Sequence, residues 1–189
     1  MEVEGPSPCT VSTGPTLCVV IMGVSGCGKS TVGTALAKTM NATFIDADDL
    51  HPSQNVEKMR AGKPLTDSDR WPWLDLVGSA FVAAQRPFTI IACSALRRAY
   101  RERITSAAGT AVLFLYLKGT KDIISARLAK RVHDYMPTSL LDSQFATLEA
   151  PDDEEFAETV DVSAPLDDIV AECVAHVRHH TNARRKSRL

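Results

Sequence analysis

The stretch from Gly23 to Thr31, GVSGCGKST, holds the residues of this sequence that are best suited to chemistry. Its spacing fits G-x-x-x-x-G-K-[ST], the P-loop pattern, in which glycines let backbone N–H groups turn toward a bound phosphate. In such a loop Lys29 reaches the β- and γ-phosphates of ATP, and the Ser30 hydroxyl binds Mg²⁺. A glycine-rich turn without a ligand is the alternative. The expected ATP-binding residues are Gly23, Val24, Ser25, Gly26, Cys27, Gly28, Lys29, Ser30 and Thr31.

A cluster of carboxylates, DADD, follows the apolar run at 43–47. If that strand continues to its end, Asp46 and Asp48 point to the same side, because side chains alternate along a strand. One carboxylate would then serve Mg²⁺ through water, and the other would accept a proton from an attacking hydroxyl. The alternative is an Asx turn that caps the next helix.

Mixed charges in the stretch KMRAGKPLTDSDR suit a small anionic polyol, since arginines bind carboxylates and aspartates accept from hydroxyls. A turn between two helices, with Thr66 or Asp67 as N-cap, would explain the same residues without a function. Farther on, CSALRRAYR places two arginines after a strand. Neighbouring helix residues diverge by about 100°, so we expect one of Arg97 and Arg98 to face the site.

Cys27 lies inside the expected phosphate cradle. The helix N-terminus and Lys29 both favour a thiolate there, which makes the residue a candidate for modification when nucleotide is absent. A small residue that only fills space is the alternative.

The elements that position these residues alternate between strand-like and helix-like runs. Strands are expected at 17–22, 43–47, 88–93, 112–117 and 159–162. Such alternation predicts an α/β domain, a five-stranded parallel sheet with helices on both faces. Ligands of these sheets bind at the carboxyl edge of the strands, where the residues above converge.

Composition excludes several classes of protein. At 189 residues and 44% hydrophobic content the chain suits one globular domain, and a net charge of −2 provides no basic field for nucleic acid. Five scattered cysteines give neither a disulfide framework nor a zinc site. The longest apolar runs fall short of the roughly 18 residues of a membrane span. Residues 1–16 are acidic and rich in Pro, Gly, Ser and Thr, which predicts a disordered tail.

Several motifs together resemble the short P-loop gluconokinases, from about Leu17 to Val177: GVSGCGKST, DADDLHP, NVEKMRAGKPLTDSDRWPWL, CSALRRAYR, FLYLKG and SQFATLEAP. HP-x-x-N-x-x-KM and PL-x-D-x-DR-x-PWL are not general P-loop features. The resemblance implies a nucleoside-monophosphate-kinase-like fold related to shikimate kinase. It implies phosphorylation of D-gluconate by ATP at the 6-hydroxyl, with Asp48 as the base.

The segment Arg127–Phe145 resembles the lid and adenine-contacting region of that family, which implies a mobile lid at about 131–139. Arg127 would lie near the adenine, and Arg131 would act as an internal arginine finger. Relatives usually read Gly-His-Phe where this chain has His133-Asp134-Tyr135, so the roles of His133 and Asp134 stay open. Gln144 either reaches a gluconate hydroxyl or lies on a helix surface.

These interpretations assign Lys29, Asp48 and Arg131 to catalysis, and Ser30 and Asp46 to Mg²⁺. The expected substrate residues are Asp48, His51, Lys58, Arg60, Asp69, Arg70, Arg97 and Gln144. Two other functions remain open: a P-loop kinase of another small polyol or acid such as shikimate, and a nucleotide-binding switch. A homodimer is compatible with the sequence.

The kinase domain is expected to span 17–180, followed by a basic tail, 181–189. We expect the last helix to end near His179 and the run HHTNARRK to be extended. The final residues, Ser187-Arg188-Leu189, match the peroxisomal address S-K-L with Arg in place of Lys. They predict an import receptor as partner and a peroxisome-type organelle, such as a glycosome, as the location; a cytosolic enzyme with a solvated tail is the alternative.

Overall fold

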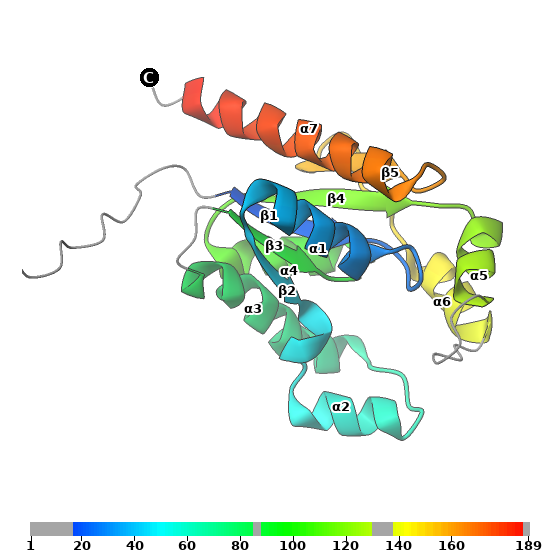
Figure 1. Cartoon of the computed structure of the whole chain (residues 1–189). Coiled ribbons are helices and arrows are strands. Elements are labelled where there is room, and N and C mark those ends of the chain that lie inside the picture. Colours follow the sequence, from blue (N-terminus) through cyan, green and yellow to red (C-terminus); the bar gives the residue numbers. More distant parts are fainter. Residues whose placement is uncertain (1–16, 85–87, 130–137, 187–189) are drawn as a thin grey trace, which may run out of the picture.

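The structure is a computed structural model that describes residues 17–84, 88–129 and 138–186. One parallel sheet has the strand order β2-β3-β1-β4-β5 (Figure 1). The strands are β1 (Leu17–Met22), β2 (Thr43–Asp46), β3 (Phe88–Ala92), β4 (Val112–Lys118) and β5 (Ala157–Asp161). The predicted five-stranded parallel sheet is therefore confirmed, and its carboxyl ends share one edge.

Helices cover both faces of the sheet. One face packs against α1 (Lys29–Met40) and α7 (Leu166–Lys186), and the other against α3 (Asp67–Ala83) and α4 (Arg98–Ala108) (Figure 1). The central strand β1, LCVVIM, is buried at every position, because alternate side chains enter the two cores. A continuous apolar run is typical of a parallel strand that is covered on both faces.

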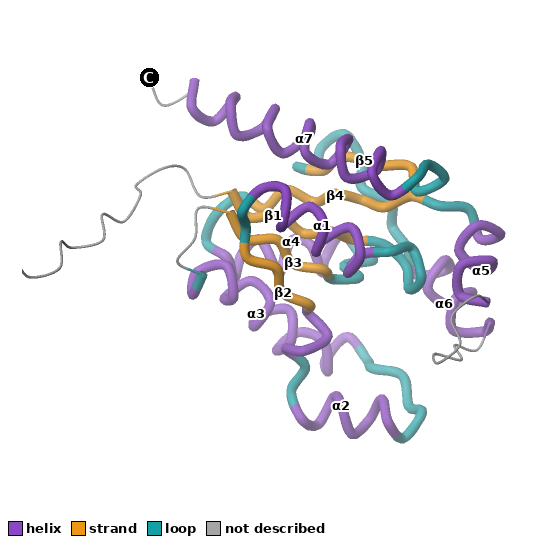
Figure 2. Tube along the Cα trace, in the orientation of Figure 1, coloured by secondary structure: helices purple, strands orange, loops and turns teal. Residues whose placement is uncertain are grey.

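The remaining helices surround the carboxyl edge of the sheet. The short 3₁₀ helix η1 (Ala47–Leu50) follows β2 directly, and α2 (Ser53–Arg60) comes next. Figure 2 shows α2 projecting from the body of the fold, with a loop at each end. At the end of β4 lie α5 (Lys121–Ala129) and α6 (Thr138–Thr147) (Figure 1). No helix among the described residues is long and apolar enough to cross a membrane.

The end of the chain differs from the prediction. Helix α7 continues to Lys186 instead of ending near His179, so the predicted extended tail is wrong as far as Lys186. Tertiary contacts hold these last turns: the Arg184 guanidinium lies 5.4 Å from the centre of the Phe156 ring, and His180 Nε2 lies 2.7 Å from Glu158 Oε1. Neither Phe156 nor Glu158 belongs to the segment that forms α7, so the pattern of that segment alone does not predict its last turns.

Smaller differences affect strand ends. Strand β2 stops at Asp46, and β5 begins at Ala157, before the predicted start at Thr159. The predicted tail at 1–16, most of the predicted lid and the last three residues lie outside the described residues.

Candidate active site

The P-loop joins β1 to α1 in the predicted order. Gly26 and Gly28 adopt φ angles of 82° and 103°, in the left-handed region that side chains other than glycine rarely adopt. Gly28 precedes α1, whose N-terminus has no side-chain cap and no acidic residue in its first turn. Unsatisfied N–H groups at a helix N-terminus bind anions, so this cradle fits a phosphate.

Lys29 and Ser30 open α1 at the edge of the cradle. The Lys29 ammonium donates to the Val24 carbonyl at 3.2 Å, so it lies across the loop. The Ser30 hydroxyl donates to Asp46 Oδ2 at 2.6 Å, which places a carboxylate from the end of β2 beside the P-loop. No cluster of three or more Asp, Glu, His or Cys side chains in the described part of the chain could hold a metal. Two oxygen donors nevertheless fit Mg²⁺, which usually takes one or two protein ligands together with phosphates and water.

Asp46 and Asp48 come together by a different route from the one predicted. The strand does not continue to Asp48; Asp46 caps η1, and its Oδ1 accepts the Asp48 N–H at 3.2 Å. The expectation based on strand alternation is therefore wrong, and the alternative, an Asx turn, is correct. The turn still leaves the two carboxylates close enough for Asp46 to raise the pKa of Asp48.

The electrostatic environment of Asp48 suits a base. Its side chain is accessible to solvent, yet the surrounding protein partly dehydrates the carboxyl and so raises its pKa above 3.8. The adjacent Asp46 carboxylate raises the pKa further, whereas Lys29 and His51 lower it. A carboxylate with a raised pKa binds a proton more readily, as a general base must.

Trp73 fixes the turn that carries Asp48. Its indole Nε1–H donates to the Ala47 carbonyl at 2.7 Å, and its ring stacks on His51 with centroids 4.1 Å apart. Burial lowers the pKa of His51, although Asp48 opposes this effect. No role was predicted for Trp73, because 26 residues separate it from Ala47 and no sequence pattern links the two.

The structure brings Arg70 and Arg97 together around Asp67 and Tyr100. Asp67 accepts from the Tyr100 hydroxyl at 2.5 Å and from Arg97 at 2.8 Å, and Arg70 lies 3.8 Å from it. Both guanidinium carbons lie 5.8 Å from the Tyr100 ring centre. Sequence reasoning assigned no site role to Asp67 or Tyr100. Tyr100 could have been found, because it lies three residues after Arg97 and shares its helix face.

Arg98 points away from that cluster. It pairs with Glu102, Asp152 and Glu154 at 3.2 to 3.3 Å. The two adjacent arginines therefore diverge as expected, Arg97 toward Asp67 and Arg98 toward these acidic residues, and the role of Arg97 in substrate binding stays a prediction.

Lys58 and Asp69 hold the connection between α2 and α3. Asp69 Oδ2 accepts from the Lys58 ammonium at 2.5 Å, and from the Thr66 N–H and hydroxyl at 2.7 and 2.6 Å. These hydrogen bonds hold the pKa of Asp69 well below its usual range. Of the two predicted N-caps, Thr66 and Asp67, the structure shows Thr66 as the N-cap of α3, with a capping box. Arg60 is exposed at the end of α2.

Two residues from α5 and α6 contact the P-loop. Arg127 donates to the Cys27 carbonyl at 3.3 Å and to the Val162 carbonyl after β5. Gln144 Oε1 accepts the Ser25 N–H at 2.6 Å, a contact that neither interpretation of Gln144 included. Arg131, His133 and Asp134 lie outside the described residues.

Comparison with known proteins supports the resemblance. The family described as an AAA domain matches residues 18–151. The thermoresistant gluconokinase of Escherichia coli K12 is 41% identical over 162 residues, which cover 84% of this chain and 92% of that protein. The crystal structure of a gluconokinase from Sinorhizobium meliloti 1021 superimposes with a TM-score of 0.83 at 40% identity, covering 92% of this chain and 98% of that one. The chain belongs to the gluconokinase family. Shikimate kinase from Aquifex aeolicus, with a TM-score of 0.55 and 14% identity, shares the fold alone.

In this member of the gluconokinase family, a buried arginine braces the loop beside the P-loop. Arg101, 1% exposed, makes two hydrogen bonds of 2.6 Å to Glu155 and others to the Ala95 and Glu149 carbonyls. Ala95 has a φ of 43°, and the preceding Ser94 carbonyl accepts the Gly23 N–H at 3.2 Å. Each of the three guanidinium nitrogens thus has a hydrogen-bond partner, as a buried charge requires, and the bond to Ala95 holds the strained backbone next to the cradle.

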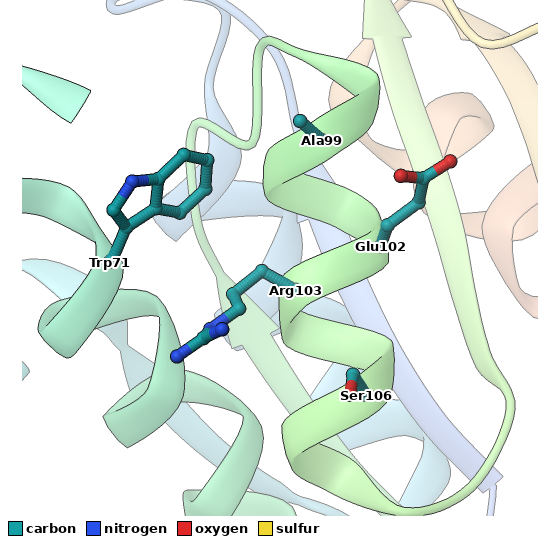
Figure 3. Close-up of a pocket in the computed structure, with 5 residues that line it drawn as sticks. All are labelled: Trp71, Ala99, Glu102, Arg103 and Ser106. Atoms are coloured by element: carbon teal, nitrogen blue, oxygen red, sulfur yellow. The ribbon is translucent and has the colours of Figure 1, made fainter. Parts of the chain in front are cut away.

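One groove on the protein surface lies outside the candidate site. It measures about 420 Å³ and is lined by Trp71, Ala99, Glu102, Arg103 and Ser106, on the outer sides of α3 and α4 (Figure 3). Arg103, one of its walls, is paired with Asp75. None of these residues belongs to the P-loop or to the pair Asp46 and Asp48, so this groove is not the candidate active site.

Cys27 is a packing residue in this gluconokinase-family chain. Its side chain is fully buried, and burial raises the pKa of the thiol despite the nearby Lys29. Of the two interpretations of Cys27, the structure therefore favours the space-filling residue over the reactive thiolate.

We expect Cys27 in the folded protein to react with iodoacetamide far more slowly than a free thiol, because only the exposed thiolate is nucleophilic. The rate should be the same with and without ATP. Peptide mass spectrometry over a time course measures it, with urea-unfolded protein as the fully reactive control. Rapid alkylation that ATP prevents would contradict this result.

Proposed function

We propose that this chain transfers the γ-phosphoryl group of ATP to the 6-hydroxyl of D-gluconate, giving ADP and 6-phospho-D-gluconate. The observation that carries the proposal is the position of Asp48, in the turn after Asp46, whose carboxylate accepts the hydroxyl of P-loop Ser30, in a chain about 40% identical to gluconokinases over most of its length. A nucleotide switch needs no carboxylate base beside its phosphate cradle.

The reaction requires charge neutralisation and alignment more than covalent chemistry. The bond from O6 to the γ-phosphorus forms as the bond from that phosphorus to the bridging oxygen of ADP breaks. Asp48 accepts the proton of the 6-hydroxyl, and Lys29 neutralises charge on the phosphates. Arg131 is proposed to do the same from the lid. Ser30 and Asp46, the latter through water, would hold Mg²⁺, which supplies further charge neutralisation on the phosphates.

Recognition of the acid is assigned to the cluster at the start of α3 and α4. Arg70 and Arg97 present two guanidinium groups near one tyrosine ring, and arginine pairs bidentately with carboxylates. Asp67 and Tyr100 orient them. His51, which stacks on Trp73, is proposed to donate to a substrate hydroxyl. Lys58 and Asp69 are proposed to act by holding the turn between α2 and α3, and Arg60 by binding substrate at the exposed end of α2.

An ADP-release assay tests this proposal. Gluconate, shikimate, glycerate and nucleoside monophosphates would be compared as acceptors at equal concentration. ADP formation that depends on gluconate supports the gluconokinase function. Comparable turnover with shikimate would indicate another polyol or acid kinase, and ADP release without any acceptor would indicate a nucleotide switch.

We also propose that Ser187-Arg188-Leu189 directs the enzyme to a peroxisome-type organelle through an import receptor. Deleting Leu189 should move an N-terminally tagged protein from the organelle to the cytosol, because the address is read at a free carboxyl terminus. Kinase activity should not change, since these residues follow the helix that packs on the sheet. Fluorescence microscopy with an organelle marker measures the location; a diffuse cytosolic signal from the intact chain would exclude the address.

A further inference from the structure

The helices on either side of residues 130–137 both contact the P-loop. From α5, Arg127 donates to the Cys27 carbonyl, and Leu128 packs so closely on Gly26 that an added Cβ would lie 2.6 Å from its Cγ. From α6, Gln144 Oε1 accepts the Ser25 N–H. Three successive residues of the cradle therefore contact side chains that are 100 or more positions away in the sequence.

The Gln144 contact is built into the fold. Leu141, one turn earlier on α6, is 1% exposed in the main core, and Phe145 packs against the same cluster. These apolar contacts fix α6, and Gln144 points from it to the loop. The Ser25 N–H is a donor, so the amide oxygen of Gln144 must face it.

The Ser25 N–H lies outside the strand and the helix, so it takes no part in their regular hydrogen-bond ladders. It precedes Gly26, whose φ of 82° interrupts regular structure, and it lies beyond the end of β1 and before the start of α1. A side-chain acceptor at this point fixes the direction of the peptide that leads into the phosphate-binding turn. Because this N–H donates to Gln144, it does not donate a hydrogen bond to a phosphate in the cradle.

We propose that Gln144 is a positioning residue that holds the P-loop in its nucleotide-binding shape, and not a ligand of the sugar acid. This inference rests on the proposed kinase function for its kinetic consequence, but its structural consequence is independent of that function. Loss of one neutral hydrogen bond that preorganises a site typically costs enough to weaken binding about three- to tenfold.

The test compares Gln144→Met with Gln54→Met. Methionine keeps the length and shape of glutamine but cannot accept the Ser25 N–H. Gln54 is exposed on α2, so the same change there serves as the matched control. Calorimetric titration with the magnesium complex of a non-hydrolysable ATP analogue, without gluconate, should show about three- to tenfold weaker binding for Gln144→Met only.

Hydrogen exchange supplies a readout that does not depend on catalysis. In the nucleotide-free protein the Ser25 amide should exchange faster in Gln144→Met than in the wild type or in Gln54→Met. The melting temperature should change little, since Leu141 and Phe145 still anchor α6. In the ADP-release assay the KM for ATP should rise and the KM for gluconate should stay constant.

Several results would overturn the inference. A raised KM for gluconate with unchanged nucleotide affinity would make Gln144 a substrate ligand. Tighter nucleotide binding by Gln144→Met would mean that Gln144 competes with the nucleotide. Unchanged binding and exchange would remove any positioning role. If gluconate gives no ADP but binding and exchange change as expected, the proposed function fails and the role of Gln144 stands.

Discussion

Lys29→Ala should lower kcat/KM by about 10²- to 10³-fold, the loss seen when one preorganised charge contact to a transition state is removed. The reason is local: Lys29 opens α1, and its ammonium already lies across the loop on the Val24 carbonyl. Moving from that carbonyl to the phosphates needs only a side-chain rotation. ADP release at saturating gluconate, measured across ATP concentrations, gives the change.

Lys38→Ala is the matched control, because Lys38 is an exposed lysine in the last turn of the same helix. It removes the same charge from α1 at the end remote from the cradle, and its kinetics should equal those of the wild type. Both variants should keep the wild-type melting temperature within a few degrees, since neither side chain is buried. Turnover of Lys29→Ala near the wild-type rate would refute the P-loop assignment.

The fold was predictable from sequence because its signals are local. A continuous apolar run such as β1 and a glycine pattern such as Gly23–Gly28 report burial and backbone conformation without reference to distant residues. The end of α7 was not predictable in this way. Its last turns contact Phe156, just before β5, and Glu158, within β5, and both lie more than 20 residues earlier in the sequence.

In the candidate site too, contacts between sequence neighbours were predictable and contacts between distant residues were not. Glycines, Lys29 and Ser30 are adjacent in sequence, so their joint role is visible in one motif. The partners that orient the remaining groups are separated from them: Asp67 from Tyr100 by 33 residues, and Ser25 from Gln144 by 119. Polar side chains at such separations carry no periodic pattern, so only the folded structure pairs them.

At Asp48 the two predicted carboxylates are related by a different geometry from the predicted one. Strand alternation predicted that Asp46 and Asp48 share a side, whereas the strand ends at Asp46 and an Asx turn brings the two carboxylates together. The anchor of that turn, the Trp73 indole on the Ala47 carbonyl, comes from α3. The sequence indicated which residue types follow the strand. It did not indicate the Asx turn and the Trp73 hydrogen bond that position them.

Asp48→Asn should lower kcat by about 10²-fold or more, because asparagine keeps the size of the side chain but cannot accept the proton of the 6-hydroxyl. Affinity for ATP should change little. Asp49→Asn is the matched control: Asp49 is the next residue of η1, is also exposed, and loses the same charge. An unchanged kcat for Asp48→Asn would transfer the role to Asp46 or remove it.

The pH dependence provides a second, independent signature of Asp48. Partial dehydration and the Asp46 carboxylate both raise the pKa of Asp48, so the acidic limb of kcat/KM should lie above pH 3.8. Activity falls as pH drops through that pKa, because the base becomes protonated. Asp46→Asn removes a negative neighbour, which favours ionised Asp48, so the limb should move to lower pH even though total activity decreases. A limb that stays in place in Asp46→Asn, or that persists in Asp48→Asn, would assign the titration to another group.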